Sequence, residues 1–210
     1  MDLLPSGALL PFYEGKSCKL LPLSADDVVA LYAEASVQVV LSAYRPWYRP
    51  DEHGIPALLR RMQWLAQLQP PLEVEALVVH RASNTPLGFI CLAGLDTLNA
   101  KAELAVAFFR GQGSRPALEA VHWVLESAFT RLQLYKLVFC VAPDNHQAHH
   151  FLQGLGIDCE AVLREEVLDP RGQRVDLWRY ALTASQWASS PARKRLQRLV
   201  PLRSDVETAG

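Results

Sequence analysis

The segment best suited to chemistry is "FFRGQGSRPALEA" at residues 108–120, where a glycine-containing turn joins an apolar stretch to a helical one. Backbone N–H groups in the first turn of a helix have no partner within the helix and lie at the positive end of its dipole. We therefore expect this turn to bind an anion, and a phosphate group is the natural candidate.

Two common phosphate motifs fit this turn poorly. A P-loop needs Lys followed by Ser or Thr after its last glycine, and no such pair follows here. A dinucleotide fingerprint needs a third glycine and a parallel βαβ unit, whereas the segments before this turn read as an antiparallel meander.

Glu103 is a candidate general base because it interrupts the otherwise apolar stretch "KAELAVAFF" at residues 101–109. A partly buried carboxylate has a raised pKa and can accept a proton directly or through a water molecule. Alternatively, Glu103 faces solvent at an edge of the sheet and does no chemistry.

The segment "NHQAHHFLQGLG" at residues 145–156 carries several polar side chains on an expected helix. Asn145 suits the N-cap position. His146, His149 and His150 have a spacing that could collect a metal ion, but no carboxylate or cysteine accompanies them at ligand spacing. We expect a solvated helix face and no metal. His122, near the apolar face of the preceding helix, is expected to be a core histidine.

Aromatic residues and arginines alternate in "AYRPWYRP" at residues 43–50. Tyr44, Arg45, Trp47 and Tyr48 could shape a slot for an acidic or aromatic acceptor molecule. Equally, the rings could cover the core while the arginine heads stay in water.

Hydrophobic periodicity and turn residues indicate the elements that position these groups. Seven strands are expected at residues 16–22, 72–81, 87–95, 101–109, 136–142, 159–168 and 175–183. Four helices are expected at residues 24–42, at 55–69, from Pro116 to about 132, and at 145–156. The order predicts an α/β (α+β) fold with a mixed, mostly antiparallel seven-stranded sheet flanked by about four helices.

In this order, residues 101–183 resemble the GNAT superfamily of acyl-CoA N-acyltransferases. The resemblance rests on "AELAVAFF" before the loop, "RGQGSRPALEAVHWVLESAF" as loop and helix, "LYKLVFCVAPDN", "NHQAHHFLQGLGI" and "DLWRYALTASQW". It is greatest to the RimJ/RimL-type branch, which acetylates protein N-terminal amines and includes many enzymes acting on small amines.

The resemblance implies acetyl-CoA as cofactor and an amine as acceptor. Its pyrophosphate would lie on the loop residues Arg110, Gly111, Gln112, Gly113, Ser114 and Arg115. Backbone N–H groups of Val106, Ala107 and Phe108 would polarise the thioester carbonyl, Asn145 would contact the cofactor arm, and Glu103 would be the base.

The loop departs from the family pattern Q/R-x-x-G-x-G/A. The pattern fits with its start at Arg110 or at Gln112, and the second register is favoured because it keeps the following helix in step. Either register puts Arg115 where a glycine or another small residue is usual. Arg115 would either add a charge-assisted contact to the pyrophosphate or obstruct it. Many relatives also have a tyrosine as general acid where this chain has Leu152 or Phe151.

The composition gives no sign of a nucleic-acid or membrane partner. The 210 residues include 21 basic and 22 acidic side chains, and no segment approaches the ~20 apolar residues that a membrane span needs. We expect a cytoplasmic monomer or homodimer. Residues 1–188 would form the acetyltransferase domain, and 189–210 a flexible basic tail with Arg193, Lys194, Arg195, Arg198 and Arg203.

Two other interpretations remain open. Arg115 and the missing tyrosine would also suit a GNAT-fold module that binds CoA or a protein partner without turnover. A nucleotide-binding protein is the third possibility, and it predicts that ATP or NAD, but not CoA, stabilises the fold against heat.

Overall fold

The computed structural model describes residues 13–32, 60, 63–64, 67–68, 73–169 and 171–202. These residues form a sheet in the order β1-β2-β3-β4-β5-β6-β8-β7. The pair β5–β6 is parallel and the other neighbouring pairs are antiparallel. The strands are β1 (Tyr13–Glu14), β2 (Cys18–Pro22), β3 (Glu73–His80), β4 (Pro86–Asp96), β5 (Lys101–Phe108), β6 (Lys136–Val141), β7 (Asp158–Leu168) and β8 (Arg174–Thr183).

The sheet is mixed and mostly antiparallel, as expected, but it has eight strands instead of seven. The additional strand is β1, which lies before the first predicted strand at 16–22 and is joined to β2 by a tight turn in which the Gly15 N–H donates to the Cys18 carbonyl at 2.9 Å. The six other strands begin and end within about one residue of the expected positions.

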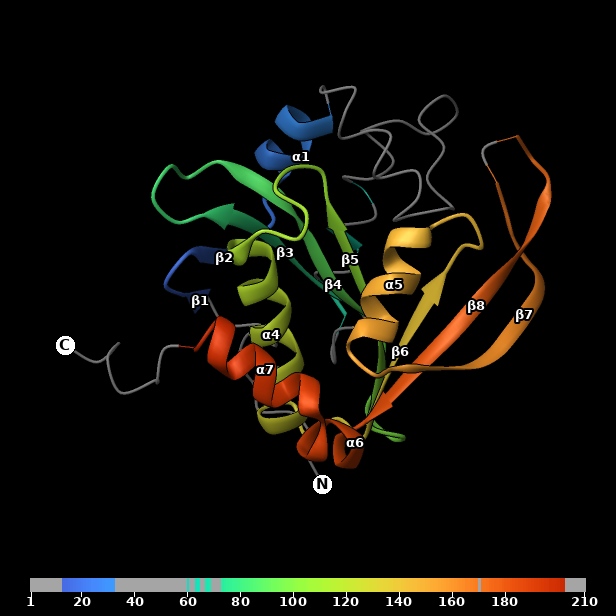
Figure 1. Cartoon of the computed structure of the whole chain (residues 1–210). Coiled ribbons are helices and arrows are strands. Elements are labelled where there is room, and N and C mark those ends of the chain that lie inside the picture. The colour runs from blue at the N-terminus through green and yellow to red at the C-terminus, as the bar shows by residue number, and fades with distance from the viewer. Residues whose placement is uncertain are drawn as a thin grey trace.

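The described helices are α1 (Ala25–Tyr32), α4 (Arg115–Thr130), α5 (His146–Gly154), α6 (Ala184–Ser189) and α7 (Pro191–Leu199). Figure 1 shows α4 and α5 side by side on one face of the sheet, with α7 across α4. The predicted helices at 24–42 and 55–69 lie largely outside the described residues, apart from α1 at the start of the first.

A buried carboxylate joins α4 to the β1–β2 turn. Glu119 on α4 is only 1% exposed, and it accepts hydrogen bonds from the Lys16 N–H at 2.6 Å, the Ser17 N–H at 2.7 Å and the Tyr13 hydroxyl at 3.1 Å. The Ser17 hydroxyl also donates to it. A Cβ on Gly15 would lie 2.2 Å from the same carboxylate, so the turn requires glycine there.

The C-terminal segment differs from the expected flexible tail at 189–210. Its first part forms α7, where Ser190 caps the helix and Ala192, Leu196 and Val200 are buried at intervals of four residues. The Arg193 guanidinium donates to both oxygens of Glu126 on α4, at 2.6 and 2.9 Å. An apolar stripe within a basic sequence therefore fixes this helix to α4.

Glu119 gives a direct test of the α4 attachment. Glu119→Ala leaves the buried Tyr13 hydroxyl and the part-buried N–H groups of Lys16 and Ser17 without an acceptor, so we expect the free energy of unfolding to fall by about 3 kcal/mol. Urea unfolding measures the loss. Glu166→Ala, at an exposed position on β7, is the control and should change stability by less than about 0.5 kcal/mol. A loss below about 1 kcal/mol in Glu119→Ala would contradict the assignment.

The Glu126–Arg193 pair makes stability depend on pH. Burial alone would raise the pKa of Glu126, but nearby His122 and Arg193 outweigh it and lower the pKa to about 2. His122 Nε2 lies 3.7 Å from the carboxylate, beyond hydrogen-bond distance, so Arg193 is the main partner. Because the folded-state pKa is lowered, the stabilisation is present above the unfolded-state pKa and is lost as the pH falls toward 2.

We therefore expect Glu126→Gln to lower the free energy of unfolding by about 1–2 kcal/mol at pH 7. The difference in the free energy of unfolding between this variant and wild type should narrow steadily below about pH 4.5. Chemical unfolding across pH 3–7 measures it, with Glu160→Gln as the control, because Glu160 makes an exposed ion pair with Lys136. A difference in the free energy of unfolding that stays constant with pH would refute the role of the Glu126–Arg193 pair.

Candidate active site

The loop before α4 places its glycines where the backbone needs them. Gly111 has φ +61° and Gly113 has φ +73°, a region that favours glycine. Arg115, in contrast, is the first residue of α4, directly after the N-cap Ser114, and its side chain is exposed. An arginine at this helical position therefore causes no backbone strain.

The same loop presents unpaired backbone donors. The N–H groups of Gly111, Gln112, Gly113 and Arg115 donate to no other residue in the part of the chain that the structure describes. The Ala117 N–H is taken by the Ser114 hydroxyl oxygen at 3.5 Å. Exposed N–H groups at a helix N-terminus are suited to binding a phosphate.

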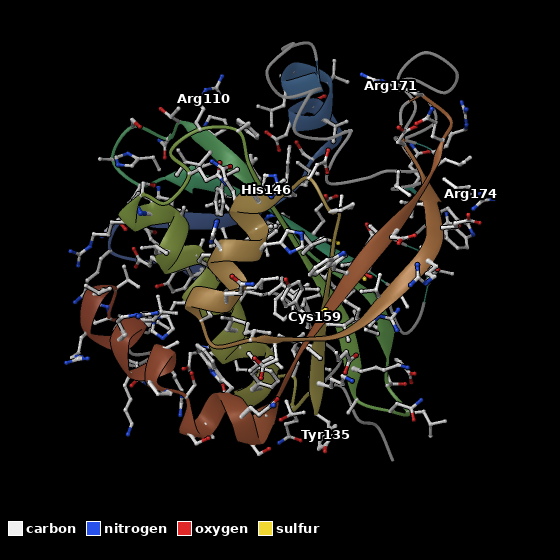
Figure 2. All side chains as sticks on the ribbon, turned by 45° about the vertical axis from the view of Figure 1, so that its right-hand side comes forward. Arg110, Tyr135, His146, Cys159, Arg171 and Arg174 are labelled. Carbon is white, nitrogen blue, oxygen red and sulfur yellow. The ribbon has the colours of Figure 1, made fainter. Side chains whose placement is uncertain are left out.

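Arg110 attaches the start of the loop to β4. Its N–H donates to the Leu87 carbonyl at 3.1 Å, and its guanidinium donates to the Pro86 carbonyl at 3.3 Å. The guanidinium also lies over the Phe109 ring, 5.2 Å from its centre. Figure 2 places Arg110 and His146, the first residue of α5, toward the same end of the molecule.

The strands β5 and β6 separate at Glu103. Their register runs from Lys101 opposite Lys136 to Glu103 opposite Val138 and goes no further, although β5 continues to Phe108 and β6 to Val141. We call this opening the fork. Figure 1 shows the far ends of the two strands diverging, with the loop before α4 at that end of the sheet.

The ladder with β4 determines which N–H groups point into the fork. The Phe109 N–H donates to Leu87 of β4, so alternation along an antiparallel strand also turns Ala107 toward β4. The N–H groups of Val106 and Phe108 then face the side of β6. Of the three residues expected to polarise a carbonyl, Val106 and Phe108 are therefore oriented for it, and Ala107 is not.

Glu103 lies at the apex of the fork. The interpretation that it sits at a sheet edge is wrong, because β5 lies between β4 and β6. The side chain is half-buried, and burial raises the pKa of its carboxyl, although the Cys140 thiol and the positive charge of Arg179 act in the opposite direction. A carboxylate in this environment can accept a proton.

Gly88 contributes to the site and was not recognised in the sequence. It lies opposite Phe108, and a Cβ there would come within 2.1 Å of the Ala107 carbonyl oxygen and 2.8 Å of the Phe108 Cα. Glycine is therefore required for β4 to approach β5 beside the fork. The available signal was a glycine inside a strand pattern, which often marks a close backbone approach.

The start of α5 contains an N-cap and a fixed histidine. Asn145 accepts a hydrogen bond from the Ala148 N–H at 3.1 Å. His149 Nε2–H donates to the Ala142 carbonyl at 3.0 Å, so Nδ1 accepts from the Tyr180 hydroxyl at 2.7 Å. Because both ring nitrogens are occupied, His149 is not available to a metal and instead ties α5 to β6 and β8.

His122 is a core histidine, as predicted. It is 1% exposed, and its Nδ1–H donates to the Val200 carbonyl at 3.0 Å. Leu152 is buried and Phe151 packs against the core, so neither supplies a hydroxyl on α5. The proposed acceptor residues Tyr44, Arg45, Trp47 and Tyr48 lie outside the described residues.

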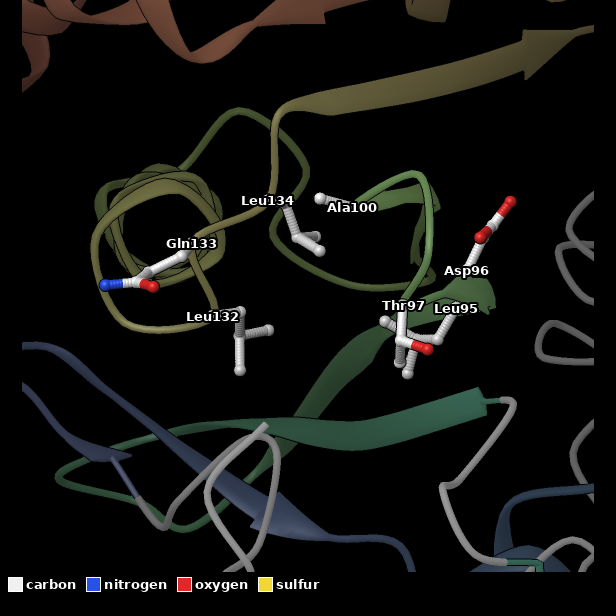
Figure 3. Close-up of a pocket in the computed structure, with 7 residues that line it drawn as sticks. All are labelled: Leu95, Asp96, Thr97, Ala100, Leu132, Gln133 and Leu134. Carbon is white, nitrogen blue, oxygen red and sulfur yellow. The ribbon is translucent and has the colours of Figure 1, made fainter. Parts of the chain in front are cut away.

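A small cavity lies at the opposite end of β5 from the loop. Its volume is about 60 Å³, enough for a few water molecules but not for a cofactor. Figure 3 shows its lining, which comes from the β4–β5 turn and the connection between α4 and β6: Leu95, Asp96, Thr97, Ala100, Leu132, Gln133 and Leu134. The candidate site is therefore the fork and not this cavity.

Comparison with solved structures identifies the fold. A GCN5-related N-acetyltransferase from Brucella melitensis has a TM-score of 0.72 and 17% identity, covering 90% of this chain and 86% of that one. The spermidine N-acetyltransferase from Vibrio cholerae, in complex with CoA and spermine, has a TM-score of 0.68 and 20% identity, covering 82% and 98%. The fold is therefore the GNAT fold.

The sequence itself matches the family described as "Acetyltransferase (GNAT) domain" over residues 18–158. The chain belongs to this family, whose members are acyl-CoA-dependent N-acyltransferases. No curated protein matches the sequence. Within the residues that the structure describes, no helix combines the length and apolar character needed to cross a membrane.

Proposed function

We propose that this protein transfers an acetyl group from acetyl-CoA to a primary amine by direct attack of the amine. The observation that carries the proposal is the fork: a half-buried carboxylate at its apex, strand N–H groups directed into it, and unpaired N–H groups of a helix N-terminus at the same end of the sheet.

The residues present fit acetyl-CoA, which supplies an acetyl group activated as a thioester. The unpaired N–H groups of Gly111, Gln112, Gly113 and Arg115 would hold its pyrophosphate, and the exposed Arg115 side chain would add a charge-assisted contact. Val106 and Phe108 would donate to the carbonyl oxygen and stabilise negative charge that develops there. Glu103 would take the proton from the amine.

The acceptor is proposed only as a primary amine, on a protein N-terminus or a small molecule. The Vibrio cholerae neighbour acts on spermidine and so gives one example of a small amine for a similar fold. Membership of the RimJ/RimL-type branch, contact of Asn145 with the cofactor arm, an acceptor slot at Tyr44, Arg45, Trp47 and Tyr48, a cytoplasmic location and a monomeric or homodimeric state stay predictions.

One observation favours a second candidate, a module that binds CoA without turnover. The positions where many relatives have a tyrosine are Phe151 and Leu152, which have no hydroxyl to protonate a leaving thiolate. Calorimetry with acetyl-CoA, combined with an assay of CoA release over a panel of amines, distinguishes the two. Binding with turnover supports the transferase, binding without turnover supports the module, and absence of binding contradicts both.

Glu103→Gln tests the base. The amide keeps the shape of the side chain but cannot take a proton at neutral pH, so we expect kcat to fall by about 10²–10⁴-fold. The dissociation constant for acetyl-CoA should stay within about twofold of wild type, because Glu103 does not hold the cofactor. Glu166→Gln on β7 is the matched control and should keep full activity. Full activity in Glu103→Gln would remove the residue from the mechanism.

Arg115→Ala tests the role of the unusual arginine. If the side chain contacts the pyrophosphate, its loss weakens acetyl-CoA binding by about tenfold and reduces the dependence of binding on salt. Arg115→Glu should weaken binding further. Arg171→Ala, at an exposed position near the β7–β8 turn, is the control and should have no effect. Tighter binding by Arg115→Ala would mean that the arginine obstructs the loop.

A further inference from the structure

Three polar side chains from three strands lie on one face of the sheet at the fork. Glu103 of β5 is opposite Val138, Cys140 lies two residues further along β6, and Arg179 of β8 is opposite Cys140. Residues two apart on a strand share a face, so Glu103, Cys140 and Arg179 point to the same side. This is the side away from α5, because Tyr180, the neighbour of Arg179, bonds to His149 of α5.

Arg179 has few other interactions to explain its position. The residue is half-buried, and its Nε is buried without a hydrogen-bond partner within the described residues. Its positive charge acts on both Glu103 and Cys140. A partly buried guanidinium with an unpartnered nitrogen is more favourable beside an anionic group, so its position on the face of Glu103 is informative.

The other groups on this face do not replace Arg179. Glu73 and Glu75 of β3 lie on the same face, and Glu73 is separated from Glu103 only by Ala93 of β4. Lys101 is exposed and pairs with Asp96 at 3.6 Å. Cys91 is a buried thiol opposite Ala105. Lys136 of β6 lies on this face too, and it pairs with Glu160 at 2.7 Å. Lys101 and Lys136 are nearer to Glu103 in register than Arg179 is, but each is paired with another carboxylate, whereas Arg179 forms no ion pair with any of the described residues.

We propose that Arg179 is a positioning residue that, together with the Cys140 thiol, keeps the half-buried Glu103 carboxylate charged and ready to accept a proton. Cys140 comes from β6, the strand between Glu103 and Arg179, and both the thiol and the guanidinium act to lower the pKa of the Glu103 carboxyl. The role as a base rests on the proposed function, whereas the pairing of the three side chains does not.

The pairing predicts a specific change in titration. Burial raises the pKa of Glu103, and both Arg179 and Cys140 lower it. Removing either partner should therefore raise the pKa, so that the carboxylate becomes protonated at a higher pH than in wild type. A base that is protonated cannot accept the proton of the amine, and the acidic limb of the kcat/KM profile should move to higher pH with it.

The experiment titrates the Glu103 carboxyl by ¹³C NMR in protein without ligand, with Glu103→Gln to assign the signal. In Arg179→Gln we expect the midpoint to rise by about one pH unit. Arg179→Lys, which keeps the charge, should restore most of the wild-type value. Cys140→Ala removes only the thiol donor and should give a smaller rise. Near-UV circular dichroism verifies that each variant is folded, and Cys140→Ala supplies the test if Arg179→Gln is not.

The pH profile of kcat/KM supplies the second readout. A rise in the NMR midpoint with a matching shift of the acidic limb supports the proposal. An unchanged midpoint in folded Arg179→Gln overturns the proposal. If only Cys140→Ala folds, an unchanged midpoint in that variant overturns it. A loss of activity that is equal at every pH also overturns the proposal. A shifted midpoint in a protein without transferase activity supports the pairing and counts against the proposed function alone.

Discussion

The structure depends on one constraint: β5 has a partner on both sides only as far as Glu103. Beyond that residue β5 pairs with β4 alone. Every second N–H group of β5 there lacks a hydrogen-bond partner on the β6 side. Backbone donors inside a protein are almost always satisfied, so a row of such donors in the middle of a sheet is uncommon and is suited to a ligand. Gly88 keeps this part of β5 paired with β4, because a side chain there would push the two strands apart. The fork therefore results from the backbone, and the side chains determine what it can do.

The position of α4 relative to the fork is fixed at two places. Near its start, the buried Glu119 carboxylate holds the helix to the β1–β2 turn. Further along, Glu126 binds Arg193 of α7, and His122 binds the carbonyl of Val200 after α7. These attachments are polar and directional, so they set the rotation of the helix as well as its distance from the sheet. These attachments hold the loop before α4 at the open end of the fork, although they do not involve β6.

Much of the fold could be predicted from the sequence because its signals are local. Alternating apolar residues bounded by turn residues gave six strands to within about one residue, and Pro116 marked the start of α4 to within one residue. What was missed depends on partners far away along the chain. The helix α7 looks like a charged tail until Leu196 is seen to be buried and Arg193 to bind Glu126 of α4. Gly88 and Arg179 acquire a role only from their neighbours across the sheet. The orientation of Ala107 follows from strand register, which residue types alone do not determine.

The absence of a hydroxyl at Phe151 and Leu152 bears on how the leaving thiolate would be protonated. The two ring nitrogens of His149 are engaged, and Tyr180, 1% exposed, is bonded to that histidine, so neither group can turn toward the fork without losing a buried hydrogen bond. Water can serve as the donor in place of these described side chains, and the exposed loop at Gly111–Gly113 provides a nearby solvent boundary. A thiolate is a stable leaving group near neutral pH, because an ordinary thiol has a pKa of about 8.5. Protonation by solvent after departure is therefore sufficient, and the rate should depend more on the charged state of Glu103 than on a dedicated acid.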